Sequence, residues 1–127
     1  MKVLVMDGVS EEGLVPLRGR PDIEVVIGSK MTEDELVEVI PEYDAMIVRS
    51  ATKVTARIFE KADRLKVVGR AGVGVDNIDL EAATRKGVLV VNAPDGNTIA
   101  ATEHTIAMML AMARNIPQAV GKLKEGV

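Results

Sequence analysis

The chain has 127 residues, enough for one domain built around a single hydrophobic core. Apolar residues make up 47% of it and charged residues 28%, which excludes a disordered polymer. The net charge of −3 and the single Phe and Tyr argue against a nucleic-acid partner, which needs basic and stacking side chains. Cysteine is absent and histidine occurs once, so we expect neither disulfides nor a metal site.

The amino terminus does not have the pattern of a secretory signal, because Asp7 ends the apolar run "VLVM". No apolar run approaches the length that spans a membrane. We therefore expect a cytoplasmic location and no membrane partner.

Short β-branched runs alternate with helical segments from the amino terminus to residue 92. Strands are predicted at 2–6, 23–27, 45–49, 66–69 and 88–92, and helices at 10–19, 32–40, 55–63 and 79–87. Capping signals support two of the helices: Thr32 with Glu35 forms a capping box, and Asp79 and Gly87 fit a start and a stop. The alternation predicts an α/β fold with a parallel sheet and helices on both faces. Five such units fit a flavodoxin-like strand order, 2-1-3-4-5, in which ligands bind at the carboxyl ends of the strands.

The carboxyl-terminal part differs in pattern. Residues 97–126 are predicted to form one long helix that begins at an Asn97 or Thr98 cap and is broken or kinked by Pro117. Few polar residues lie between positions 105 and 113, so this helix is expected to be buried on nearly all sides. We divide the chain into a flavodoxin-like domain at 1–97 and a helix at 98–127 whose natural partner lies elsewhere.

Loops with anion-binding chemistry follow the third and fifth predicted strands. Arg49 can donate two hydrogen bonds to a carboxylate or phosphate, with backbone amides near Ser50 and Ala51 as further donors. The alternative is an Arg49 that only pairs with a surface carboxylate. Asn97, after the fifth strand, can present an amide to a ligand or simply cap the helix that follows it.

The stretch "GRAGVGVDNID" after the fourth strand resembles a dinucleotide-binding loop but fails its test. A G-x-G-x-x-G loop runs straight into a helix, whereas Asn77 stands where the third glycine is needed and the helix is predicted only near Asp79. We interpret Gly72 and Gly74 as letting backbone N–H groups at 71–74 approach a small anion, with Arg70 adding charge. The alternative is that both glycines only permit a turn with positive φ.

Other polar residues carry no visible chemistry. Asp7 follows the first strand, but the acidic pair and the second acceptor of a phosphoryl-receiver domain are missing. His104 lies in the apolar helix without a carboxylate that could orient it. From these residues alone the chain is an anion-binding α/β domain without a catalytic set.

Taken together, "VRSATKVT", "VVGRAGVGVDNIDLEAATRKGVLVVNAPDGNT" and "AMARNIPQA" resemble the amino-terminal part of the D-2-hydroxyacid dehydrogenase family. They are most similar to its members that oxidise 3-phosphoglycerate to 3-phosphohydroxypyruvate with NAD, the entry step of serine biosynthesis. The resemblance implies a flavodoxin-like substrate-binding domain paired with a Rossmann domain.

The resemblance also implies roles for individual residues. Arginines would hold the phosphate and backbone amides the carboxylate of a small phosphorylated hydroxy acid, and Val73 would lie near the nicotinamide. The implied substrate-binding residues are Arg49, Ser50, Ala51, Arg70, Ala71, Gly72, Val73, Gly74 and Asn97.

The family's glycine fingerprint and catalytic Arg, Glu and His fall beyond the matched segments, so no catalytic residue is expected among these 127, and His104 is not the catalytic histidine. We expect a fragment that is inactive alone and binds no NAD by itself. We also expect two uncovered apolar surfaces, one on the sheet domain and one on the 98–114 helix, and a homodimer through that helix with fold-back in a monomer as the competitor. A stand-alone anion-binding or interaction module is the alternative function.

Overall fold

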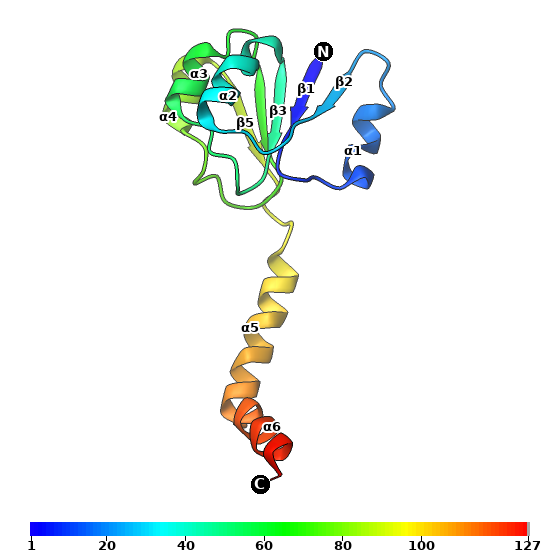
Figure 1. Ribbon diagram of the computed structural model, residues 1–127, viewed down its shortest axis with the longest axis vertical. Helices are drawn as coiled ribbons and strands as arrows, with labels where there is room; N and C mark the ends of the chain where they lie inside the picture. Colours follow the sequence, from blue (N-terminus) through cyan, green and yellow to red (C-terminus); the bar gives the residue numbers. More distant parts are fainter. Residues whose placement is uncertain (127) are drawn as a thin grey trace. The chain divides into compact units, whose positions relative to one another are not determined.

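The computed structural model describes residues 1–126 (Figure 1). Contacts divide the chain into two compact units, Met1–Pro94 and a second that begins at Asp95. The first unit holds a parallel five-stranded sheet in the order β2-β1-β3-β4-β5, which confirms the predicted topology. The strands are β1 (Lys2–Val5), β2 (Glu24–Ile27), β3 (Ala45–Val48), β4 (Val67–Arg70) and β5 (Leu89–Asn92).

Helices cover both faces of the sheet, as Figure 1 shows. One face packs against a large apolar cluster centred on Phe59, Met46 and Val68, to which the helices after β2, β3 and β4 contribute. The other face packs a smaller cluster around Leu14 of the first helix. These helices are α1 (Glu11–Arg18), α2 (Glu33–Val39), α3 (Ala56–Lys61) and α4 (Leu80–Lys86), with the 3-10 helix η1 (Ile40–Glu42) after α2.

Local capping signals account for most helix boundaries. The capping box of Thr32 and Glu35 starts α2, and the Asp79 carboxylate accepts the Ala82 N–H at the start of α4. Thr55 stands at the N-cap position of α3 but makes no capping hydrogen bond with its side chain, because its hydroxyl donates to Glu33 instead. Thr55 is therefore the N-cap residue of α3 by position and not by a side-chain hydrogen bond.

Gly87 ends α4 in a left-handed conformation with φ of +73°. We expect Gly87→Ala to destabilise the protein by about 1 kcal/mol, because a Cβ is disfavoured in that conformation even though nothing surrounds it. Urea unfolding followed by circular dichroism measures the change. Gly121→Ala is the control: its Cβ would also meet nothing, but φ there is not in the left-handed region, so stability should not fall. Equal stability of Gly87→Ala and wild type would contradict the assignment.

The sheet face that packs α1 is only partly covered. Leu89 and Val91 of β5 are 61% and 44% exposed, and their register partners on β4 are Val67 and Gly69. An apolar surface of the sheet domain is therefore open to solvent at this edge, as the sequence led us to expect.

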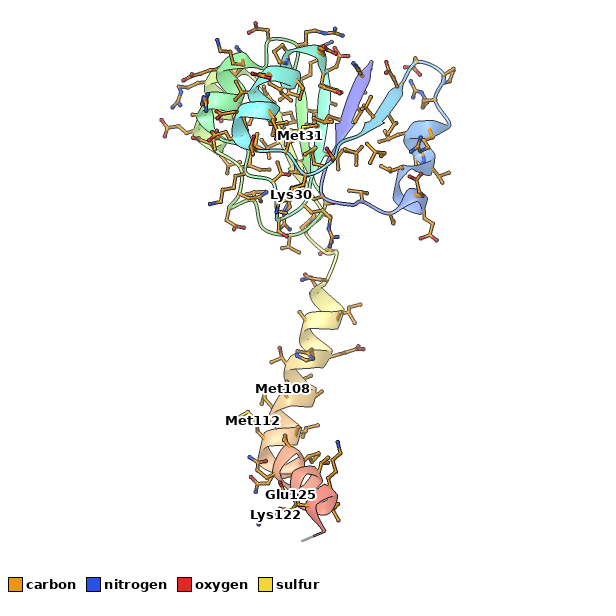
Figure 2. All side chains as sticks on the ribbon, viewed as in Figure 1. Lys30, Met31, Met108, Met112, Lys122 and Glu125 are labelled. Atoms are coloured by element: carbon orange, nitrogen blue, oxygen red, sulfur yellow. The ribbon has the colours of Figure 1, made fainter. Side chains whose placement is uncertain are left out.

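The second unit contains two helices rather than one, α5 (Thr98–Ala113) and α6 (Ile116–Glu125). The predicted break falls at Asn115, which has φ of +50°, and Pro117 sits inside the first turn of α6, where its missing N–H costs nothing. The described chain buries no residue of α5, although the sequence predicts burial on nearly all sides. Figure 2 shows Met108 and Met112 projecting from the same side of this helix. No helix within residues 1–126 is long and apolar enough to cross a membrane.

Candidate anion-binding site

The predicted substrate loops meet at the carboxyl edge of the sheet. Val48 of β3 pairs in register with Arg70 of β4, and Arg70 pairs with Asn92 of β5. The first residues beyond these strands are thus neighbours, and the Ala71 N–H donates to the Val48 carbonyl at 2.8 Å. The structure therefore brings together the two segments that sequence reasoning singled out, 49–51 and 70–74.

Two side chains from distant parts of the chain hold the loop after β3. The Asp7 carboxylate accepts hydrogen bonds from the backbone N–H groups of Arg49 (2.9 Å) and Thr52 (3.0 Å), and from the Thr52 hydroxyl (2.6 Å). The Asn77 side-chain amide donates to the carbonyls of Arg49 (2.7 Å) and Thr52 (2.6 Å). We call this arrangement the Asp7–Asn77 clamp. The clamp binds the backbone N–H and carbonyl groups of Arg49 and Thr52, and Ser50 and Ala51 lie between these two residues.

Asp7 itself lies in a left-handed conformation, with φ of +65°, and is followed by Gly8 with the same value. Partial burial pushes the pKa of the Asp7 carboxyl upward, but the hydrogen bonds from Thr52 and from the backbone of Arg49 and Ala51 outweigh it. The pKa therefore lies below its ordinary value, and Asp7 is an anion at neutral pH.

This pKa shift predicts a pH dependence of stability. A depressed carboxyl pKa means that the stabilisation is fully present above the unfolded-state pKa, about 3.9, and is lost as pH falls towards the folded-state pKa. Asp7→Asn removes the titrating group, so the difference in unfolding free energy between wild type and variant should shrink as pH falls through that range. Urea unfolding at a series of pH values tests this. A difference that stays constant from neutral pH to strong acid would contradict it.

The loop after β4 has its own anchors. The Gly72 carbonyl accepts the Ala93 N–H at 3.0 Å, and the Val73 carbonyl accepts the Asn92 side-chain amide at 2.6 Å. The Ala71 and Gly72 N–H groups already donate to backbone carbonyls, which leaves Val73 and Gly74 as the amides of this loop with no acceptor among residues 1–126. Of the four backbone N–H groups at 71–74 that were predicted to bind an anion, only those of Val73 and Gly74 are therefore available within the described residues.

Neither Gly72 nor Gly74 has a positive φ, so backbone conformation does not require glycine at these positions. The absence of a side chain matters instead, because a Cβ at either position would meet a neighbouring side chain. A Cβ on Gly72 would lie 1.7 Å from Nη1 of Arg70, so the guanidinium rests directly against this glycine. A Cβ on Gly74 would lie 2.8 Å from the Asp76 carboxylate. The turn explanation for these glycines is thus wrong, and Gly72 instead makes room for the Arg70 guanidinium beside the loop.

Neither arginine of the site pairs with a carboxylate within residues 1–126. Arg49 is exposed and takes part in no ion pair within the described chain. Arg70 is half-buried, and its Nε is buried with no hydrogen-bond partner among the residues described. Arg49 directly follows Val48, the register partner of Arg70, so both arginines lie at the edge of the sheet that also carries the free loop amides. Such an arrangement is suited to an anionic ligand.

The remaining predicted residues belong to the second unit or contribute little polar chemistry. Asn97 is part of the second unit, where it stands at the N-cap position of α5 without a capping hydrogen bond from its side chain. The side chain of Val73, as distinct from its free N–H, offers only an apolar contact, and the residue is 39% exposed. His104 is exposed on α5. No cluster of three metal-ligating side chains occurs in the part of the chain that the structure describes.

Sequence reasoning missed Asp7 and Asn77 as organisers of the site. It compared Asp7 only with a phosphoryl acceptor and treated Asn77 only as an absent glycine. The available signal was that an Asp-Gly pair directly follows a buried strand, at the edge where ligands bind in this topology. The hydrogen bonds themselves link residues 25 to 45 positions apart, which no local pattern reveals.

Comparison with known proteins identifies the same family as the sequence motifs, over nearly the whole chain. The family model described as "D-isomer specific 2-hydroxyacid dehydrogenase, catalytic domain" matches residues 3–127. The D-3-phosphoglycerate dehydrogenase of Synechocystis is 52% identical over 98% of this chain, and that of Archaeoglobus fulgidus is 53% identical over 99%. This chain spans only 22% and 24% of the length of those two relatives.

Among solved structures, an NAD+-bound 3-phosphoglycerate dehydrogenase from Entamoeba histolytica superposes with a TM-score of 0.75 at 30% identity. The match covers 87% of this chain and 38% of the solved one. The family model extends over both compact units and includes the loops 49–51 and 70–74. The chain belongs to the D-isomer specific 2-hydroxyacid dehydrogenase family.

Proposed function

We propose that this chain is the substrate-binding part of an NAD-dependent D-3-phosphoglycerate dehydrogenase, which oxidises 3-phosphoglycerate to 3-phosphohydroxypyruvate in serine biosynthesis. One observation carries the proposal: Arg49 and Arg70, both without acidic partners in the described chain, stand with free loop amides at the sheet edge where ligands bind in this topology. The names of the relatives at 52% and 53% identity support the choice of substrate.

Each end of the substrate has suitable donors. The guanidinium groups of Arg49 and Arg70 would hold the phosphate, for which planar bidentate donors are well matched. The backbone amides of Ser50, Val73 and Gly74, which have no acceptor within residues 1–126, would hold the carboxylate. Asn97, in the second unit, is proposed as a substrate-binding residue on the family resemblance alone. Ala51, Ala71 and Gly72 then shape the site without donating to the substrate.

The described residues do not fit a dinucleotide. Asn77 replaces the third glycine of the fingerprint, its side chain is committed to the clamp, and α4 begins only at Leu80. The proposed enzyme would use NAD as hydride acceptor, but within this chain only Val73 would approach it, by packing. We also propose that these residues turn over no substrate alone, because the site holds no group suited to proton transfer.

Titration of the isotope-labelled chain with 3-phosphoglycerate, followed by NMR, tests the binding function. The amide signals of Ser50, Val73 and Gly74 should shift progressively and saturate, with smaller changes at Ala51, Ala71 and Gly72, which do not donate to the substrate in the proposed arrangement. Shifts confined to other parts of the chain would refute the site.

We further propose that the chain forms a homodimer through α5. Met108, Met109, Leu110 and Met112 of this helix are all more than half exposed, so it presents apolar side chains all round. Such a surface favours association, and a second copy of the same helix offers a matching apolar surface. A cytoplasmic location also remains a prediction.

A further inference from the structure

We propose that Asp7 and Asn77 are positioning residues for the substrate, acting together through the loop 49–52. The Asp7 carboxylate accepts from backbone N–H groups of this loop, and the Asn77 amide donates to its carbonyls. Together they hold Arg49 and the Ser50 amide in one conformation. This inference rests on the proposed function, since it concerns the same ligand.

The clamp provides hydrogen-bond partners for the backbone N–H and carbonyl groups at both ends of the loop. Arg49 and Thr52 each give their N–H to Asp7 and their carbonyl to Asn77, with all four distances between 2.6 and 3.0 Å. The Ser50 N–H between them has no acceptor within the described chain. Because Arg49, Ser50 and Ala51 are exposed, packing does not fix this loop, and the hydrogen bonds to the two side chains do so instead.

Two unfavourable features accompany this arrangement. Asp7 adopts a left-handed backbone that disfavours residues with a Cβ, and Asn77 keeps its Oδ1 buried with no hydrogen-bond partner among residues 1–126. Unfavourable conformations and unpaired polar atoms that persist at a ligand site point to a functional requirement. Here the requirement is a fixed anion-binding loop.

The clamp also joins the two substrate loops. Asn77 lies in the segment after β4, and its own carbonyl accepts the Val54 N–H at 2.8 Å while its side chain grips the loop after β3. The clamp thereby ties the loop that carries Arg49 to the segment that follows Arg70, while the pairing of β3 with β4 fixes Arg70 itself. A phosphate that contacts both arginines needs this fixed separation, because its donors must converge on one group.

The negative charge of Asp7 should weaken anion binding, whereas its hydrogen bonds to the loop should strengthen it. The two effects have opposite signs, so substitutions at Asp7 can separate them. A carboxylate near an anion site weakens anion binding by repulsion, so its removal alone would tighten binding. Asp7→Asn is nearly isosteric: the amide oxygen can replace the acceptor of the two N–H groups, and the amide nitrogen can donate to the Thr52 hydroxyl. Asp7→Gly removes the side chain and suits the left-handed backbone.

The test measures 3-phosphoglycerate binding to the 127-residue chain by calorimetry, with folding checked by circular dichroism. We expect Asp7→Gly to weaken binding about tenfold or more, and Asp7→Asn to stay within about threefold of wild type. Asn77→Asp, which puts a carboxylate opposite two carbonyls, should also lose about tenfold. Asp76→Asn, a charge change beside Gly74 outside the clamp, is the control for electrostatics.

Failure of the proposed function and failure of the clamp give different results. If wild type does not bind 3-phosphoglycerate, the proposed function is overturned and the inference falls with it. If wild type binds and folded Asp7→Gly binds equally well, the inference alone is overturned. Tightening by Asp7→Gly that matches Asp76→Asn would also overturn it, since Asp7 would then act only by charge. Should Asp7→Gly fail to fold, Asn77→Asp decides, and wild-type affinity in that variant would contradict the clamp.

Discussion

Replacing Arg49 and Arg70 together by glutamine is expected to weaken binding of 3-phosphoglycerate about a hundredfold or more, the largest effect on affinity that we predict. Both guanidinium groups lack acidic partners in the described chain, so neither is neutralised before the ligand arrives. Glutamine keeps much of the length and polarity of arginine but removes the charge and the paired donors. Calorimetric titration of the folded variant measures the loss.

The matched control replaces two arginines that already have carboxylate partners. Arg20 pairs with Asp22 and Arg85 with Glu81, both on exposed surface away from the site loops. The double change of Arg20 and Arg85 to glutamine alters the net charge equally and should leave affinity within about threefold of wild type, because exposed charges at a distance are screened. Equal losses in the two double variants would show that the chain attracts the ligand only by its overall charge.

Changing Met109 and Leu110 to glutamine is expected to convert the chain from dimer to monomer at high micromolar concentration. These side chains are 64% and 61% exposed on α5, and burying them against a second copy removes apolar surface from water. Light scattering reports the mass directly. Helix content should be retained, because both positions are exposed and glutamine is a good helix former.

Val15→Gln is the control for this experiment. Val15 is 63% exposed on α1, so the change removes a comparable apolar group from a surface that we do not assign to association. It should leave the dimer intact. A wild-type chain that is monomeric at high micromolar concentration, with a mass unchanged in the α5 variant, would rule the dimer out and favour fold-back within one chain.

The fold of the first unit was predictable because its signals are local and repeated. Each strand is a short β-branched run, and signals such as the Thr32 capping box and the Gly87 stop delimit the helices. The second unit was harder to predict. Pro117 was a clear signal for a break, but the break occurs at Asn115, because proline is acceptable in the first turn of a helix and the turn before it absorbs the change of direction.

The site was predictable to the extent that it follows from topology. Parallel strands bring their carboxyl ends to one edge, so the alternation of strands and helices is enough to place Arg49 and Arg70 together. Which amides remain free could not be predicted, since it depends on the pairing of Ala71 with Val48 and of Gly72 with Arg70. The clamp by Asp7 and Asn77 was equally inaccessible, because it rests on side-chain contacts between distant segments.

The central claim is that one site recognises the phosphate and the carboxylate of a single ligand. Calorimetric titration of the chain with 3-phosphoglycerate, glycerate and inorganic phosphate tests it most directly, since the last two each carry one of the two anionic groups. We expect 3-phosphoglycerate to bind more tightly than either by about tenfold or more, because both anionic groups then contribute to one binding event. Equal affinity for 3-phosphoglycerate and inorganic phosphate would instead identify a general anion-binding module, and no binding of any of the three would contradict the site altogether.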